Sequence, residues 1–102
     1  MRLTAVQKTA FKKEIVACLT GEPEIRKIVV FGSFVKGDEA NDLDIAVFQV
    51  SDEPYLALAM KYRQRTRSVA RMIPLDIFPV RPGAKDSSFL DVIAAGEVIY
   101  ER

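Results

Sequence analysis

Apolar positions near the start of the chain repeat every three or four residues, at Phe11, Ile15, Cys18 and Leu19. This spacing is typical of an amphipathic helix. Thr4 followed three residues later by Gln7 has the pattern of a capping box, and Gly21 is a common helix stop. The pattern therefore predicts a helix over residues 5–20.

A continuous apolar run predicts a strand that is buried on both faces. It covers residues 25–31, and its last four residues, Ile28 to Phe31, are all β-branched or aromatic. A shorter apolar segment, Val98 to Tyr100, can add a closing strand near the end of the sequence.

Two further segments alternate in the manner of half-buried strands. Within residues 42–50 the core-like face carries Leu43, Ile45, Val47 and Gln49. The opposite face carries Asp42, Asp44, Ala46 and Phe48. Residues 74–80 repeat the pattern, with Leu75 and Ile77 on one face and Asp76 and Phe78 on the other. Both strands therefore turn acidic side chains away from the predicted core.

The segment between these two strands predicts a helix. Ser51 or Asp52 can cap it, Pro54 is tolerated in its first turn, and it should end near Met72. Its core-facing stripe would be Tyr55, Leu58, Ala59, Tyr62, Thr66, Val69 and Ala70.

The remaining connections are short. Residues 32–37 have room for no more than one helical turn, and the polar residues 38–41 are typical of a turn. Ser87 or Ser88 can cap a last helix, which Gly96 ends.

The resulting order of elements is α-β-(turn)-β-α-β-α-β. It predicts an α+β fold, an α/β two-layer arrangement in which helices pack mainly on one face of a mixed β-sheet. With no repeat or linker inside residues 1–102, we expect one domain.

Composition narrows the classes of function. A net charge of +1 gives no global sign of a nucleic-acid or membrane partner, and no apolar stretch approaches the roughly 20 residues of a membrane span. The start of the chain lacks the apolar core of a signal peptide. The single cysteine, Cys18, is typical of the cytoplasm, and its helical position favours a buried structural thiol. The absence of histidine excludes Ser-His-Asp, Cys-His and histidine-ligated zinc chemistry.

The acidic residues on the two alternating strands form a candidate metal site. Asp42 and Asp44 lie on one side of a strand, roughly 6–7 Å apart at about 3.3 Å per residue, so each raises the pKa of the other. A hard divalent cation such as Mg²⁺ relieves this repulsion. Asp76 is costly within an apolar strand unless it is paired or metal-bound. If the two strands are neighbours, three carboxylates meet and suit a one- or two-metal site for phosphoryl chemistry.

The turn after the first strand is a candidate phosphate site. Backbone N–H groups at Gly32 and Ser33 can hold phosphate oxygens, and the Ser33 hydroxyl adds a donor. Lys36 can add a positive charge, and Gly37 lets the chain double back.

Each of these residues also has an ordinary interpretation. Asp42 can be a strand-start residue, and Gly32 and Ser33 a simple turn between strand and helix. Lys36 can be solvated, and Asp76 can pair with a basic residue such as Arg71 or Arg81. Because the ordinary interpretation needs all of these coincidences in one compact region, we favour a functional site.

The stretch "GSFVKGDEANDLD" resembles the glycine-serine and paired-aspartate signature of the nucleotidyltransferase superfamily, which includes DNA polymerase beta and kanamycin nucleotidyltransferase. The chain length and the ending "FLDVIAAGEVIYER" are similar to the minimal nucleotidyltransferases of bacteria and archaea. The resemblance implies that Gly32 and Ser33 bind a triphosphate, and that Asp42, Asp44 and Asp76 are the catalytic and metal-binding carboxylates. It also implies attack of a hydroxyl on the α-phosphate of ATP or another nucleoside triphosphate, with release of pyrophosphate.

The resemblance also implies a partner. Minimal nucleotidyltransferases are often encoded beside a helical HEPN protein as toxin–antitoxin pairs, and several of them modify or mask that partner. The alternative function is thus an antitoxin that acts mainly by forming a complex, with weak or lost catalysis. The sequence departs from many relatives at Lys36, where they carry arginine, and at Asn41, where they carry serine. The turn between Gly37 and Asp42 is also about two residues shorter.

The segment "MKYRQRTRSVAR" carries a basic face, with arginines at Arg63, Arg67 and Arg71. The face can be merely solvated, or it can bind an acidic protein, a nucleotide or a polynucleotide. Since no aromatic residues interleave usefully for base stacking, we expect nucleic acid only as an acceptor of the reaction. The short length also leaves a homodimer open.

Overall fold

The computed structural model describes residues 2–37, 42–81, 83–84 and 87–102. Its helices are α1 Ala5–Leu19, α2 Ser33–Lys36, α3 Tyr55–Arg65, α4 Arg67–Ala70 and α5 Ser87–Ala94. Its strands are β1 Ile25–Phe31, β2 Leu43–Gln49, β3 Leu75–Val80 and β4 Glu97–Glu101. The predicted turn at 38–41 lies outside the described residues.

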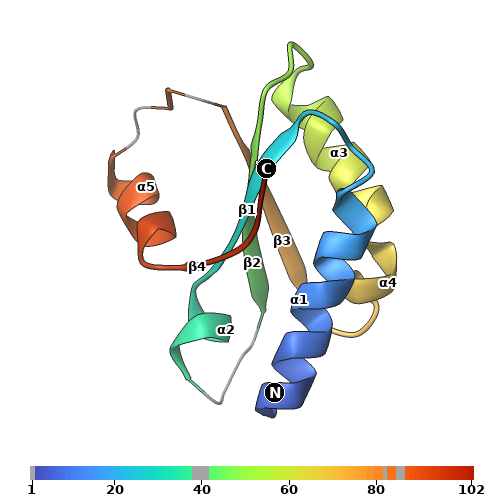
Figure 1. The fold of residues 1–102 in the computed structure, drawn as a ribbon, viewed down its shortest axis with the longest axis vertical. Coiled ribbons are helices and arrows are strands. Elements are labelled where there is room, and N and C mark those ends of the chain that lie inside the picture. The colour runs from blue at the N-terminus through green and yellow to red at the C-terminus, as the bar shows by residue number, and fades with distance from the viewer. Residues whose placement is uncertain (1, 38–41, 82, 85–86) are drawn as a thin grey trace.

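The four strands form one mixed sheet in the order β3-β2-β1-β4 (Figure 1). Strand β1 runs antiparallel to both β2 and β4, whereas β2 and β3 are parallel. A parallel pair needs a long crossover, which α3 and α4 provide. Pro79 removes one N–H donor from β3 but lies on an edge strand, where this loss is tolerated.

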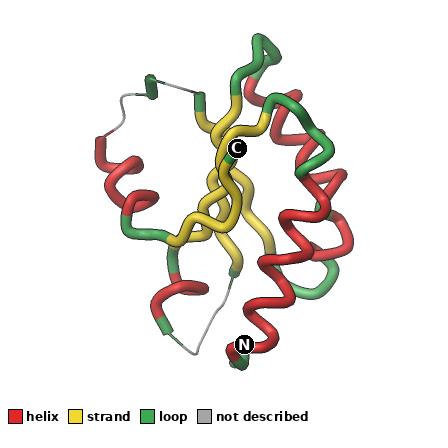
Figure 2. The backbone as a smooth tube through the Cα atoms, viewed as in Figure 1, coloured by secondary structure: helices red, strands yellow, loops and turns green. Residues whose placement is uncertain are grey.

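The helices pack on the sheet in two unequal groups. Figures 1 and 2 show α1, α3 and α4 on one face and α5 on the other. The larger core joins the first group to the sheet through Phe11, Ile15, Leu19, Ile28, Val30, Leu43, Ile45, Val47, Leu58, Tyr62 and Val69, among others. The smaller core, under α5, contains Val29, Phe31, Ala46, Val80 and Ile93. The α+β class and the placement of helices mainly on one face are confirmed.

The alternation of buried side chains along the strands follows the sequence. On β1, Ile28 and Val30 enter the larger core while Val29 and Phe31 enter the smaller one. On β2, Leu43, Ile45 and Val47 enter the larger core and Ala46 the smaller. The two aspartates of the β2 segment therefore share a face with Ala46, as predicted.

The first helix starts as its capping box predicts. The Thr4 hydroxyl accepts from the Gln7 N–H at 3.1 Å, and the Gln7 side chain accepts from the Thr4 N–H at 2.8 Å. Cys18 near its end is half-buried, and burial raises the pKa of its thiol. A raised pKa disfavours the reactive thiolate, which agrees with a structural role.

The prediction of one helix from residue 51 or 52 to Met72 is wrong. The helix begins at Tyr55 after Pro54, and the Ser51 hydroxyl instead accepts from the Glu53 N–H within the preceding turn. The helix also breaks at Thr66, where φ is −104° and ψ is 17°.

Thr66 gives a physical reason for the break. Its side chain is buried, and its hydroxyl donates to the Tyr62 carbonyl at 2.8 Å. A buried threonine hydroxyl must find such a partner, and bonding back to the carbonyl four residues earlier bends helices. The stripe predicted for one helix is therefore divided, and Tyr55 and Ala70 at its ends are exposed.

The start of the last helix also differs from the prediction. Helix α5 already includes Ser87 and Ser88, so neither of them precedes it, and the residue before it lies outside the described part of the chain. Gly96 follows the helix as predicted, and its N–H donates to the Ile93 carbonyl at 2.9 Å. No helix among the described residues is long and apolar enough to cross a membrane.

Gly96 is required by packing. A Cβ atom at this position would lie 2.4 Å from the Val30 carbonyl oxygen and 2.9 Å from Val29 Cγ1.

We expect Gly96→Ala to lower the free energy of unfolding by about 1–3 kcal/mol, because the turn between α5 and β4 must move off β1. Urea unfolding of the wild type and the variant measures this difference in the free energy of unfolding. The matched control is Gly21→Ala, whose Cβ would meet no atom within 4 Å and should change stability by less than about 1 kcal/mol. Equal stability of the two variants would contradict the prediction.

Candidate active site

The three predicted carboxylates meet at one end of the sheet. Asp44 on β2 and Asp76 on β3 are register partners in the parallel pair, and Asp42 immediately precedes β2. Each residue offers a carboxylate oxygen, and these oxygens lie within 4.8 Å of one another. Asp42 and Asp44 are half-buried, whereas Asp76 is exposed. The predicted convergence of these side chains is therefore observed.

The electrostatics of the cluster are unfavourable without a counter-charge. Burial, and then the negative charges of Asp42 and Asp76, raise the pKa of Asp44 to about 6. A hydrogen bond between Asp44 and Asp76 acts in the same direction. A divalent cation favours the ionised form of all three groups and reverses this effect. The donor set, three carboxylates that can share one ion, fits Mg²⁺.

Three aromatic rings pack together in the core on the sheet face that carries the acids. Phe31 is the β1 register partner of Asp44, and Phe78 follows Asp76 by two residues on the same face of β3. The Phe31 and Phe78 rings are 5.8 Å apart, and Phe89 from α5 lies 6.0 Å and 5.4 Å from them. Sequence reasoning did not connect Phe89 with the site. For Phe78 a signal was available, because the alternation along β3 places it on the same face as Asp76.

Gly32 lies directly against the acid cluster. Its φ is 80°, a region that residues with a side chain rarely adopt, and a Cβ there would lie 2.7 Å from Asp44 Oδ2. Ser33 then opens the single turn α2, which Phe34 anchors in the core at 1% exposure. The structure thus places the glycine-serine turn next to Asp44. Lys36 lies at the far end of α2 and is exposed.

The alternative pairing of Asp76 with an arginine is not observed. Arg81 donates instead to the Glu53 carbonyl at 2.9 Å. Within the described part of the chain, no ion pair joins Asp76 to Arg81 or Arg71. The exposed carboxylate of Asp76 is therefore available to a ligand.

Glutamates outside the basic segment neutralise part of its positive charge. Lys61 forms ion pairs with Glu22, Glu24 and Glu53 at 3.5, 2.9 and 3.2 Å, and Arg65 pairs with Glu22 at 2.9 Å. These pairs could not be predicted from local patterns, because Glu22 and Glu24 precede β1 and lie far from α3 in the chain.

The arginines of the predicted basic face differ in their surroundings. Arg63 and Arg67 line a surface hollow of about 700 Å³ together with Met60 and Leu75, whereas Arg71 lies outside it. Because α3 ends before Thr66, the three arginines do not lie on one continuous helix.

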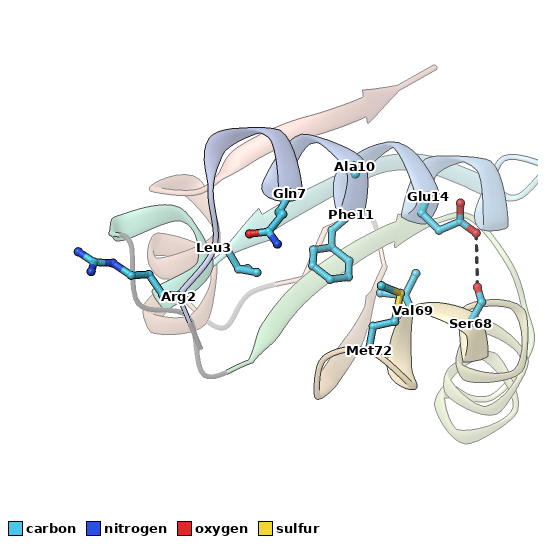
Figure 3. Close-up of a pocket in the computed structure, with 9 residues that line it drawn as sticks. All are labelled: Arg2, Leu3, Gln7, Ala10, Phe11, Glu14, Ser68, Val69 and Met72. Carbon is cyan, nitrogen blue, oxygen red and sulfur yellow. Dashed lines mark hydrogen bonds between the residues drawn. The ribbon is translucent and has the colours of Figure 1, made fainter.

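A second hollow, of about 460 Å³, lies between α1 and α4 (Figure 3). Phe11, Val69 and Met72 give it an apolar lining, and Glu14 accepts from the Ser68 hydroxyl at its rim at 3.4 Å. These helices cover the sheet face opposite to the one that carries Asp44. The hollow is therefore separate from the acid cluster.

A mixed sheet with helices mainly on one face, and with acids at the start of its parallel strands beside a glycine-serine turn, has the architecture of a nucleotidyltransferase. The family described as "Polymerase beta, Nucleotidyltransferase" matches residues 13–102, so the chain belongs to this family and is a nucleotidyltransferase by class. The comparison with curated proteins gives no match.

Several solved structures of similar fold are toxin–antitoxin complexes. One contains the tri-AMPylated HEPN toxin of Shewanella oneidensis with its MNT antitoxin; it matches at a TM-score of 0.62 and 20% identity, over 93% of this chain and 73% of that chain. A toxin–antitoxin structure with AMP-PNP matches at 0.69 and 22% identity, over 89% and 73% of the two chains. An MntA-HepT structure matches at 0.60 and 19% identity, over 92% and 73%. At these identities the likeness shows the fold.

The raised pKa of Asp44 predicts a pH-dependent stability difference between the wild type and Asp44→Asn. The usual pKa of the group is 3.8 and its folded value is about 6. Below pH 3.8 the carboxyl is neutral in both states, and above pH 6 its burial as an anion destabilises the folded state. Without metal, Asp44→Asn should therefore match the wild type near pH 4 and exceed it at pH 7.5 by about 1 kcal/mol, after allowance for solvent screening.

Urea unfolding at the two pH values measures this difference, with Asp52→Asn, an exposed acid at the other end of β2, as the control. Added Mg²⁺ should stabilise the wild type and leave Asp44→Asn unchanged. A variant that is less stable than the wild type at pH 7.5 without metal would contradict the prediction.

Proposed function

We propose that this protein transfers a nucleoside monophosphate from a nucleoside triphosphate to a hydroxyl acceptor and releases pyrophosphate. The nucleotide that we favour is AMP. The observation that carries the proposal is the contact between two predicted motifs. Gly32, which opens the glycine-serine turn, lies within van der Waals reach of Asp44, and Asp44 lies in the three-carboxylate cluster. A nucleotidyl transfer needs a triphosphate and the reacting oxygens to be held together at such a point.

The chain's own residues divide the work in this proposal. The N–H groups at Gly32 and Ser33 bind the triphosphate, and Lys36 adds a positive charge. Asp42, Asp44 and Asp76 would hold Mg²⁺, as a two-metal site in this proposal. When bound, the metal neutralises developing charge and holds the attacking and leaving oxygens in line.

In this proposal the exposed Asp76 carboxylate takes the proton of the acceptor hydroxyl. The acceptor oxygen then forms a bond to the α-phosphorus, the bond between that phosphorus and the bridging oxygen breaks, and pyrophosphate leaves. Since Asp76 is more exposed than Asp44, the acceptor approaches from the side of β3. Residues 1–102 act in this proposal as one minimal nucleotidyltransferase domain. With a single cysteine, the chain suits the reducing cytoplasm.

The proposed partner is a helical HEPN-type protein that carries the acceptor hydroxyl. Its support is the set of similar folds, in which an MNT antitoxin accompanies a HEPN toxin that is AMPylated in one case, and in which AMP-PNP is present in another. The same complexes support the second candidate function, an antitoxin that acts mainly by binding. A homodimer and a nucleic-acid acceptor are the remaining alternatives.

Transfer of label tests the proposed reaction. Purified protein, Mg²⁺, α-labelled ATP and a lysate of the native host should give a discrete labelled protein or RNA band. Asp44→Asn should lower labelling about 100-fold or more, because it removes a central metal ligand. Asp52→Asn is the matched control and should label as the wild type does. Labelling that is equal in wild type and Asp44→Asn would overturn the proposed site, and no labelling with any of the four triphosphates would overturn the reaction.

Toxin neutralisation separates the two candidate functions. With a HEPN-type toxin encoded beside this chain, a transferase antitoxin should lose neutralisation in Asp44→Asn even though the complex still forms. Neutralisation by the variant at the wild-type level would establish that binding alone suffices. Co-expression in a growth assay, with pull-down of the complex, reports both quantities.

A further inference from the structure

The glycine-serine turn depends on α1 for its support. Helix α2 has four residues, and helices this short are not stable by themselves in water. Its first cap, Gly32, has no side chain to donate or accept, and Gly37 ends it in extended backbone. The conformation of the turn is therefore determined by tertiary contacts.

Two side chains of α1 provide these contacts. Phe11 packs edge-on against Phe34 of α2, with ring centroids 6.3 Å apart and an interplanar angle of 74°. Lys8, one helical turn earlier, donates from Nζ to the Gly37 carbonyl and lies 5.7 Å from the Phe34 ring centroid. Figure 1 shows α2 and the first half of α1 at the same end of the sheet.

Lys8 itself is placed by the capping box. The Lys8 N–H donates to the Thr4 carbonyl at 3.0 Å, which closes the first turn of α1, and the Thr4–Gln7 pair fixes that turn. The Lys8 ammonium thus joins a fixed helix end to the carbonyl at which α2 stops. This carbonyl lies between the turn that begins at Gly32 and the strand that carries Asp44.

We propose that Lys8 is a positioning residue: it holds the Gly32–Ser33 turn in the conformation that binds the triphosphate beside Asp44. This inference rests on the proposed function. A fixed turn binds more tightly because its N–H groups do not have to be ordered when the ligand arrives. The ammonium group has three donors and uses one of them on the Gly37 carbonyl. Because a carbonyl is neutral and no described acidic residue pairs with Lys8, the ammonium also keeps a positive charge at this end of the sheet.

The test compares Lys8→Met, Lys8→Arg and Lys13→Met in the full chain. Methionine keeps the length of the side chain over Phe34 but cannot donate, and arginine keeps both the donor and the charge. Lys13 is an exposed lysine of the same helix and is the matched control. The probe is AMP-PNP with Mg²⁺, measured by titration calorimetry, with KM and kcat for transfer and urea unfolding measured in parallel.

We expect Lys8→Met to weaken AMP-PNP binding about 3- to 10-fold and to raise KM in step, as loss of one charge-assisted hydrogen bond would do. Lys8→Arg should restore most of the affinity, kcat should stay within about two-fold, and Lys13→Met should bind as the wild type does. Wild-type affinity in Lys8→Met overturns the inference. The inference is also overturned if Lys8→Met lowers the unfolding stability and kcat but leaves the affinity for AMP-PNP unchanged. That result would show that Lys8 has only a structural role. If the wild type itself does not bind AMP-PNP in the presence of Mg²⁺, the proposed function fails and the inference fails with it.

Discussion

The repulsion between three carboxylates at the start of two parallel strands is the constraint on which the rest of this structure depends. Like charges this close repel one another, so they stay together only where the surrounding backbone is held firmly in place. Here β2 is hydrogen-bonded on both sides, and its inward residues Leu43, Ile45 and Val47 are fully buried. The larger core thus holds Asp44 beside Asp76 in spite of their charges. A site of this kind gains stability when a divalent cation binds, so binding and local order are coupled.

The second constraint is steric and concerns the space beside Asp44. The carboxylate approaches the chain at Gly32 so closely that no other residue fits without displacement. This contact joins the part of the chain suited to phosphate to the part suited to metal, although eleven positions separate them in sequence. In the proposed function, a cation held by the acids would lie next to the phosphate bound by this turn.

Much of this arrangement could be predicted from the sequence, because it depends on local patterns. Alternation along residues 42–50 and 74–80 was enough to place the acids on one face, and the Thr4–Gln7 pattern was enough to start α1. The break at Thr66 could not be predicted, because the same residue is compatible with a continuous helix until burial forces its hydroxyl onto Tyr62. The neutralisation of Lys61 and the contribution of Phe89 were missed for a related reason. Both depend on residues brought from distant parts of the chain.

The unequal exposure of the acids gives the site a direction. Asp44 is half-buried beside Gly32 and the neighbouring acids, whereas Asp76 is exposed on the edge strand β3. A ligand held at Gly32 and Asp44 would thus present its reactive end toward the edge of the sheet. Leu75, which alternates with Asp76 and lies on the opposite face of β3, lines a hollow with Arg63, Arg67 and the glutamate-paired Lys61. The unequal exposure of the two acids therefore favours an approach of the acceptor from the β3 edge in the proposed reaction.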